Sequence, residues 1–233
     1  MPSITRGPQP NRRMSSDARE RRRRQLRTQL LNAAESLLAD GMSFTELSVE
    51  RLAVAAGISR ATFYVYFKDK SQLLKELTEE VFDEIAAAMQ HLWQRAEAAD
   101  AEDMRRATCG VIAIYRNHQG ILTAVVEVAS YVPEIDTAYR DLIERIATYS
   151  RDFLANGQAA GRIRPLDIAQ TSRIIAWMVE RSCQQMLRGT PPDADGHLAD
   201  ALTQFLWGAI YLEDSSANRN ANGDEAVGSA GGG

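Results

Sequence analysis

Apolar residues recur along most of the chain at the spacing that places them on one face of a helix. The first clear example is formed by Leu26, Leu30, Ala33 and Leu37, which follow the repeat of an amphipathic helix. Gly41 stands where a residue with left-handed backbone would end that helix. Alternating strand-like segments are missing, and the helix-favouring residues Ala, Leu, Glu, Gln and Arg dominate. The pattern therefore predicts an all-α protein.

Glycine, proline and capping residues divide this pattern into about nine helices. Ser48 and Ser59 are placed to cap two short helices, and Asp69 is placed to cap a long one, with Gln72 as its reciprocal partner. The helices expected after the first one cover about 48–55, 59–66, 70–97, 100–117, 120–131, 134–155, 166–188 and 194–212.

The stretch Leu47–Leu74 combines two short helices with a glycine-containing turn. This arrangement is typical of a helix-turn-helix, whose second helix enters the major groove of DNA. Gly57 suits the positive φ that such a turn needs, and Leu52 and Ile58 supply apolar contacts between the two helices. Similar helix pairs also occur in proteins that do not bind DNA, so the motif needs support from other features.

The second helix of the pair carries a small polar face. If Phe63 and Phe67 point inward, a rotation of about 100° per residue turns Ala61 outward with Thr62 beside it. Arg60 lies in the first turn, where its guanidinium can reach a guanine with two hydrogen bonds. The methyl groups of Ala61 and Thr62 suit contact with the thymine methyl. These features predict that this helix reads DNA bases.

The charge of the chain is unevenly divided and supports a DNA-facing N-terminal part. The formal net charge is −4, but residues 1–70 hold 13 Lys/Arg against 7 Asp/Glu, and residues 71–233 hold 14 against 24. A basic end on an acidic body favours a polyanionic partner for that end. The run Arg21, Arg22, Arg23, Arg24 is expected to contact the DNA backbone or a minor groove. A solvated helix start or a membrane-surface patch is the alternative for such a run.

Several classes of protein are excluded by short-range patterns. The apolar runs are far shorter than the roughly 18 residues that a membrane span needs, and no signal-peptide pattern is seen. Cys109 and Cys183 lack the spacing of a disulfide framework or metal site, and His91, His118 and His197 stand far apart. We therefore expect a cytoplasmic protein with no metal and no cofactor.

An enzyme is not expected, because no nucleophile elbow, P-loop or dinucleotide-binding motif occurs in the sequence. Carboxylate pairs such as Glu79–Glu80 and Asp83–Glu84 point apart on a helix and are expected on a solvated face.

The segment Gly57–Leu74, GISRATFYVYFKDKSQLL, resembles the DNA-binding domain of the tetracycline-repressor (TetR) family. The match covers about residues 24–74, and the remaining helices resemble the family in number and order, with a likeness to a mycobacterial subgroup. The resemblance implies a homodimeric transcriptional regulator, by default a repressor, on a pseudo-palindromic operator. The residues expected to contact DNA are Ser48, Ser59, Arg60, Ala61, Thr62, Tyr64, Tyr66 and Lys70, with Lys68 and Arg51 as lesser candidates.

The segment 166–188 is apolar on more than one face, so it has to be covered on all sides. By resemblance to the family, the last two helices would form a four-helix bundle with a second copy. The residues expected in that interface are Met178, Met186, Leu198, Leu202, Phe205 and Leu206.

Aromatic side chains in the middle helices would, by the same resemblance, line an apolar effector cavity. The residues expected there are Trp93, Tyr115, Glu127, Tyr131, Tyr149, Phe153, Trp177 and Glu180. Glu127 and Glu180 are the best polar candidates because each interrupts an apolar run. Core packing is the alternative for every one of these residues, and an ion pair with Arg181 is an alternative for Glu180.

Together these features predict four parts of the chain. We expect a disordered basic arm over 1–20, a helix-turn-helix DNA-binding domain over 21–69, a helical effector-binding and dimerisation domain over 70–212, and a disordered tail over 213–233. The expected partners are a double-stranded DNA operator, a second copy of the chain and a small, mostly apolar effector, but no membrane. An architectural protein that binds DNA by charge without reading its sequence is the alternative function.

Overall fold

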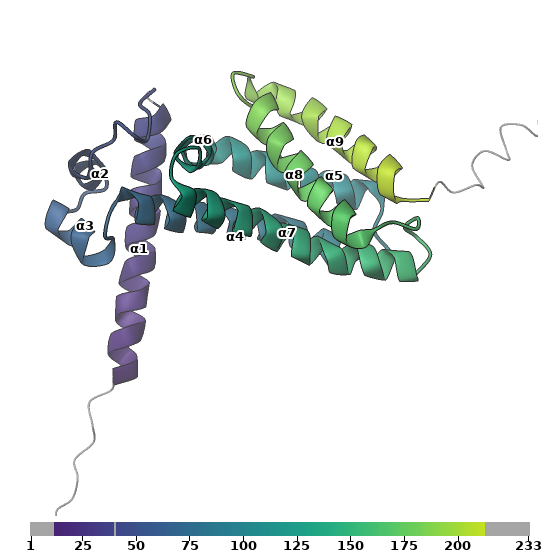
Figure 1. Ribbon diagram of the computed structural model, residues 1–233, viewed down its shortest axis with the longest axis horizontal. Coiled ribbons are helices and arrows are strands. Elements are labelled where there is room, and N and C mark those ends of the chain that lie inside the picture. The colour runs from purple at the N-terminus through teal and green to yellow at the C-terminus, as the bar shows by residue number, and fades with distance from the viewer. Residues whose placement is uncertain (1–11, 40, 213–233) are drawn as a thin grey trace, which may run out of the picture. The chain divides into compact units, whose positions relative to one another are not determined.

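The computed structural model describes residues 12–39 and 41–212, and these form nine α-helices and one short 3-10 turn (Figure 1). The described residues contain no β-strand, which confirms the prediction of an all-α fold with about nine helices. Nor is any helix among them long and apolar enough to cross a membrane. The elements are α1 (Arg12–Ala39), α2 (Val49–Ala55), α3 (Arg60–Tyr66), α4 (Lys70–Trp93), α5 (Ala101–Asn117), α6 (Gln119–Ala129), α7 (Pro133–Ala159), α8 (Ile168–Met186), η1 (Pro192–Ala194) and α9 (Asp195–Ile210).

The first helix starts earlier than the sequence pattern indicates. Because α1 begins at Arg12, the prediction of a disordered arm is wrong for residues 12–20. That segment has no apolar repeat, but its Arg, Met, Ala and Glu residues favour helix and extend a helix that is already packed further along. The remaining part of the predicted arm and the predicted tail, 213–233, lie outside the described residues.

The later boundaries also differ at two places. α4 ends at Trp93 rather than near residue 97, and α7 continues through the Asn-Gly pair at 156–157 to Ala159. Gly157 is required for close packing rather than for a turn, since a Cβ built there would lie 2.5 Å from Ile163 Cδ1. The turn itself uses Gly161, whose φ is +70°.

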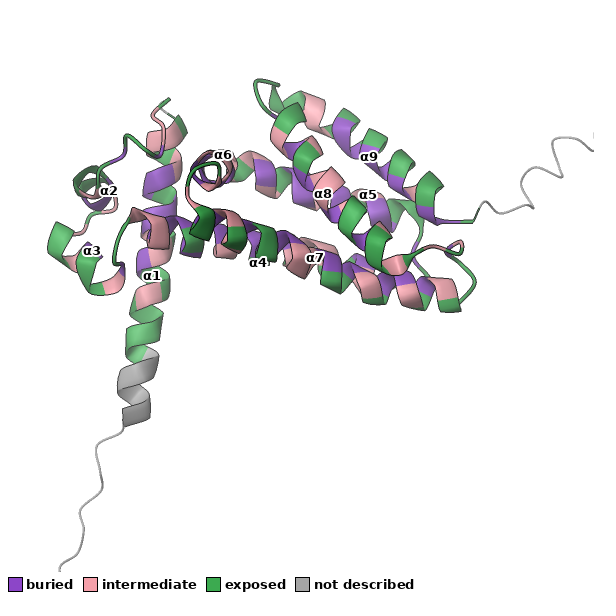
Figure 2. Ribbon diagram, viewed as in Figure 1, coloured by how far each residue is buried: buried purple, intermediate pink, exposed green. Residues whose placement is uncertain are grey.

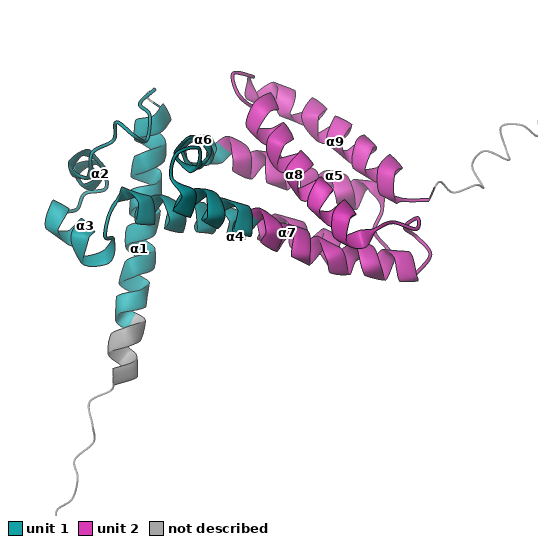
Figure 3. Ribbon diagram, in the orientation of Figure 1, with its two compact units in different colours: residues 1–84, 117–142 teal, residues 85–116, 143–233 magenta. Residues whose placement is uncertain are grey.

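The chain divides into two compact units (Figure 3). Unit 1 contains residues up to Glu84 together with 117–142, and unit 2 contains 85–116 and the residues from Ile143 onward. This division differs from the expected border at residue 70, because α6 and the first part of α4 group with the helix-turn-helix. The reason is that α1 packs against α6 and forms ion pairs with α4. A helical pattern alone does not show such contacts between distant segments.

Unit 1 is built on the apolar faces of α1 to α3. Leu30, Leu52 and Phe63 are fully buried, and burial of large apolar side chains is the main stabilising term of such a core. The turn between α2 and α3 has Gly57 at φ +69°, which confirms the conformation expected from the sequence. Ile58 N–H donates to the carbonyl of Ala53 at 2.9 Å and closes the turn.

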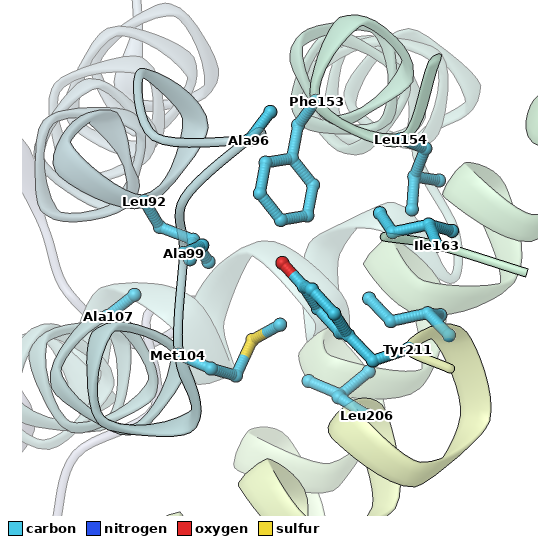
Figure 4. Packing of buried hydrophobic residues seen from close by; sticks show 11 residues of the cluster. Leu92, Ala96, Ala99, Met104, Ala107, Phe153, Leu154, Ile163, Leu206 and Tyr211 are labelled. Atoms are coloured by element: carbon cyan, nitrogen blue, oxygen red, sulfur yellow. The ribbon is translucent and has the colours of Figure 1, made fainter. Parts of the chain in front are cut away.

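Unit 2 has a core shared by α4, α5, α7 and α9. Figure 4 shows Phe153, Leu154 and Leu206 in this cluster, with the ring of Tyr211 among them. Burial raises the pKa of Tyr211 to about 12. Along α9 buried and exposed turns alternate (Figure 2), with Leu206 buried and Phe205 61% exposed, so one side of this helix faces the core and the other faces solvent.

We expect Leu52→Ala and Val54→Ala to have very different effects although both lie on α2. Leu52 is fully buried and Val54 is 75% exposed. Truncation of a buried leucine costs about 2–5 kcal/mol, whereas an exposed substitution changes stability by less than about 0.5 kcal/mol. Urea unfolding of the two variants measures the difference, and equal losses would contradict the packing of α2 described here.

Candidate functional site

The two short helices of unit 1 begin at serine caps, as predicted. Ser48 Oγ accepts a hydrogen bond from the backbone N–H of Arg51 at 3.1 Å, and Ser59 Oγ accepts one from the N–H of Thr62 at 3.0 Å. The hydroxyls of Ser59 and Thr62 lie 2.8 Å apart. Both serines therefore fix helix starts, and the start of α3 presents a pair of hydroxyl groups at the surface.

α3 buries one side and exposes the other, as the helical wheel predicts. Phe63 is fully buried, and its ring centroid lies 5.4 Å from that of buried Phe67. On the opposite side Arg60 and Ala61 are exposed, and Tyr64 is 48% exposed. The exposed residues of α3 form a surface, called here the α3 face, that consists of Arg60, Ala61, Tyr64 and Val65.

The side chains on the α3 face are partly preorganised. The guanidinium carbon of Arg60 lies 5.7 Å from the centroid of the Tyr64 ring, a cation–π distance. Val65 is 65% exposed and was not among the predicted contacts, although the helical wheel places it on this side. Thr62 and Tyr66, which were predicted contacts, are half-buried at its edges.

The structure gives Lys70 a different role from the expected contact with phosphate. Its Nζ donates hydrogen bonds to the backbone carbonyls of Phe44 at 3.1 Å, Thr45 at 3.0 Å and Leu47 at 2.6 Å. A lysine ammonium has three donors, so all three are used within the chain, and burial lowers the pKa of Lys70. Lys70 therefore holds the segment before α2, whereas the neighbouring Lys68 is exposed.

The arginine run on α1 is divided between solvent and the protein interior. The guanidinium of Arg23 forms an ion pair with Glu76 of α4. Arg21, Arg22 and Arg24 are exposed, although Arg24 Nε approaches Glu20 Oε1 at 3.7 Å. Three of the four predicted backbone contacts thus remain accessible, and Arg23 is used to attach α1 to α4.

Unit 2 contains a narrow apolar cavity of about 60 Å³. Of the predicted cavity residues, Trp93 and Phe153 line it. Its polar members are Thr108 and Ser150, whose hydroxyls donate to the carbonyls of Met104 at 2.9 Å and Ile146 at 3.0 Å in their own helices. Met104, one of the methionines that the sequence also suggests for this cavity, lines it too. The lining residues not expected from the sequence are Met89, Leu92, Thr108, Val111, Ser150, Leu154, Ile175, Val179, Leu206 and Ile210.

The other six predicted cavity residues lie elsewhere. Glu127 and Tyr131 belong to unit 1. The hydroxyl of Thr45 donates to Glu127 Oε1 at 2.8 Å, and Thr45 Oγ1 also lies 2.8 Å from the Tyr131 hydroxyl. These two residues contact the loop before α2 instead of an effector cavity. The remaining four are away from the cavity lining: Tyr115 and Glu180 are buried, Trp177 is half-buried and Tyr149 is 44% exposed beside Trp93.

The predicted dimer-interface residues fall into two groups. Met186 is 57% exposed and Phe205 is 61% exposed, so both are available to a second chain. In contrast, Leu198, Leu202 and Leu206 are buried, and Met178 packs against the core of unit 2. The large apolar residues of α8 and α9 that are exposed are Ile174, Met186 and Phe205, and together they are called here the α8–α9 face.

Comparison with known proteins gives consistent matches. Residues 30–77 match the profile of bacterial regulatory proteins of the tetR family. The chain is 26% identical over 188 residues to the HTH-type transcriptional regulator EthR of Mycobacterium tuberculosis, covering 79% of this chain and 87% of EthR. It is 29% identical over 140 residues to the HTH-type transcriptional repressor LfrR of Mycolicibacterium smegmatis, covering 58% of this chain and 70% of LfrR.

A solved structure of similar fold is that of the transcriptional regulator FadR from Bacillus subtilis in complex with stearoyl-CoA. Its TM-score is 0.63 at 15% identity, with 79% of this chain and 99% of that chain covered.

We expect Lys70→Met to destabilise the protein by about 1–3 kcal/mol, because three carbonyls lose their donor and the segment before α2 is released. Lys68→Met removes the same charge from an exposed position and is expected to change stability by less than about 0.5 kcal/mol. Thermal or urea unfolding compares the two variants at one pH. Similar stability of both would show that the Lys70 ammonium does not hold this segment.

Proposed function

We propose that the chain is a transcriptional regulator of the tetR type rather than an enzyme, and that it acts as a ligand-responsive homodimeric repressor. In this proposal the α3 face reads an operator in the major groove, and a second copy reads the matching half-site. The observation that carries the proposal is the α3 face. Phe63 buries the opposite side of α3 and Ser59 caps its start, so the exposed side is available to contact bases.

Three of the four residues of the α3 face suit a contact with bases. Arg60 can donate two hydrogen bonds to one guanine, and Ala61 and Val65 can contact the methyl group of thymine. The exposed arginines Arg21, Arg22 and Arg24 would add attraction to phosphates without selecting sequence. Arg23 contributes less to this attraction, because Glu76 neutralises it.

The alternative is an architectural protein that binds DNA by charge alone. Such a protein needs exposed cations but no shaped recognition helix. Here the exposed arginines on α1 fit both functions, whereas the capped and apolar-backed α3 face favours a sequence reader. Substitutions on the two surfaces therefore separate the two hypotheses.

We expect Arg60→Ala to weaken binding to the preferred duplex by about 1–3 kcal/mol while leaving binding to unrelated duplexes nearly unchanged. Arg21→Ala is the matched substitution, and it should weaken binding to all duplexes alike and reduce the salt slope by about 1. The measurement is fluorescence anisotropy at several salt concentrations, with a duplex enriched from a random library by the parent protein. Equal losses on all sequences for both variants would favour the architectural function.

The α8–α9 face supports the homodimer. It exposes Ile174, Met186 and Phe205 on two helices that contact each other, and large exposed apolar side chains are candidates for an interaction surface. Two recognition helices on one duplex must reach half-sites about 34–36 Å apart, which a two-fold pair of chains can provide. The dimer of the proposal therefore buries this face rather than the leucines predicted from the sequence.

We expect Phe205→Glu to raise the dimer dissociation constant at least about tenfold, the equivalent of 1.4 kcal/mol, because it places a charge in an apolar contact. Val54→Glu introduces the same charge at a position that is 75% exposed on α2, and the oligomeric state should not change. Sedimentation velocity over a concentration series measures both variants. A Phe205→Glu variant that associates as the parent does would place the interface elsewhere.

The cavity of unit 2 supports an apolar effector, because its hydroxyl groups are already bonded to helix carbonyls. At about 60 Å³ it is smaller than the roughly 300–1,000 Å³ of typical ligand pockets, so binding would have to widen it. The FadR structure is a complex with stearoyl-CoA, a molecule with a long apolar acyl chain. α4 begins at Lys70 and ends at Trp93, which lines the cavity. We propose that this helix couples effector binding to DNA binding, and a coupling free energy of this kind is typically about 1–3 kcal/mol.

A further inference from the structure

A histidine in unit 1 stands among carboxylates from two other helices. His118 directly precedes α6, and its Nε2 lies 3.3 Å from Glu84 Oε2 of α4. Its Nδ1 lies 3.7 Å from Glu35 Oε1 of α1, and its side chain is only 15% exposed. The ring therefore lies where α1, α4 and the start of α6 meet.

Glu35 also holds the first turn of α6. Its two carboxylate oxygens accept the backbone N–H groups of Gly120 and Ile121, each at 3.1 Å. Acceptance by a carboxylate is favourable at a helix N-terminus, where these N–H groups have no partner within the helix. The contact is close, since a Cβ at Gly120 would lie 2.5 Å from Glu35 Oε2. One carboxylate thus links α1 both to α6 and to the imidazole.

The acidic side chains of α4 are spaced four residues apart along the face that meets α1. Glu76 pairs with Arg23, and the next acid, Glu80, lies 4.0 Å from Arg27. Glu84, the third acid in this row, has His118 as its neighbour. Two of the three contacts use a permanent cation, and the third uses a group that titrates near neutral pH.

The charges that face His118 are mostly negative. Glu35 approaches it from α1 and Glu84 from α4, and Glu80 of α4 also interacts electrostatically with the ring. Arg27 and Asp83 act on Glu80. The first turn of α6 contains no charged side chain. The described part of the chain contains no group of three or more His, Cys, Asp or Glu side chains that could hold a metal ion. The ligand that this geometry fits is a proton on the ring.

We propose that His118 is a proton-operated link between α1 and the α4–α6 pair, and that loss of its proton loosens α1 and weakens binding to DNA. The link stands on the geometry alone, and its effect on DNA rests on the proposed function. α1 carries Arg21, Arg22 and Arg24 and packs against α2, so a looser α1 disturbs both the basic surface and the support of the recognition helix.

The sign of the pH dependence follows from the charges. The contact with Glu35 raises the pKa of His118 above its ordinary value of 6.5, burial opposes this, and Glu84 raises it further. Burial also raises the pKa of Glu80, against the effect of Arg27. A histidine with a raised pKa stabilises the folded chain fully below its unfolded pKa and loses that contribution as pH rises through the folded pKa. The link is therefore closed in mildly acidic solution and opens as the solution becomes alkaline.

The first test follows the proton in the full-length protein by NMR. The His118 ring should titrate above 6.5, and Glu84→Gln should lower that pKa because it removes one of the two neighbouring charges. Over the same pH range, protection of the Gly120 and Ile121 amides from hydrogen exchange, corrected for intrinsic rates, should fall as the ring loses its proton. A His118 pKa at or below 6.5, or one that Glu84→Gln does not move, would overturn the link.

The second test compares DNA binding by the parent and by His118→Gln at pH 6.5 and pH 8.5. The probe is the duplex enriched from a random library by the parent protein. The dissociation constant of the parent should rise more between these pH values than that of His118→Gln, whose side chain does not titrate. His91→Gln is the matched control, because His91 is 62% exposed, and it should behave as the parent does.

The outcomes separate the link from the function. Equal pH dependence in the parent and in His118→Gln would overturn the control of DNA binding even if the ring titrates as expected. Failure to enrich any duplex would overturn the proposed function, while the NMR titration would still decide the link. If His118→Gln does not fold, Glu84→Gln replaces it, and its smaller pH dependence is then the expected result.

Discussion

The burial of Phe63 and Phe67 decides how the rest of unit 1 can work. These two rings fill the space beneath α3 and fix its rotation about its axis, so Arg60, Ala61 and Tyr64 face outward together. A short helix of seven residues has little stability by itself. It therefore depends on this aromatic anchor and on the Ser59 cap, and a recognition surface can exist because one side of the helix is held so firmly.

Electrostatic pairing then attaches the recognition unit to its supporting helices. The row of glutamates on α4 meets arginines of α1 at one end and His118 at the other. Lys70, at the start of the same helix, holds the carbonyls of the segment before α2. Without these partners, the charged side chains of Arg23, Arg27 and Lys70 would face solvent or DNA. They explain why α6 and the first part of α4 belong to the same compact unit as the helix-turn-helix.

In unit 2, packing rather than polarity sets the chemistry of the cavity. Its hydroxyl-bearing residues donate within their own helices, and the aromatic and methionine side chains around them leave a narrow apolar space. Glu127, which the sequence suggests as a polar residue of this cavity, instead accepts a hydrogen bond from Thr45 in unit 1. A polar residue within an apolar run indicates that its side chain has a hydrogen-bond partner, but the sequence does not say which residue that partner is.

The sequence by itself determined the all-α class, the helix-turn-helix, its serine caps and the inward and outward sides of α3. All of these depend on periodicity and on contacts within a few residues, which one helical repeat encodes. The partners of long side chains were decided only by the tertiary structure: Lys70 and Arg23 bond within the protein, Glu80 lies beside Arg27 of α1, and Glu84 lies beside His118. Leu198 and Leu202 are buried within one chain. These outcomes depend on which helices meet across many residues of sequence. A helical pattern shows that a face is apolar or charged, but not which surface covers it.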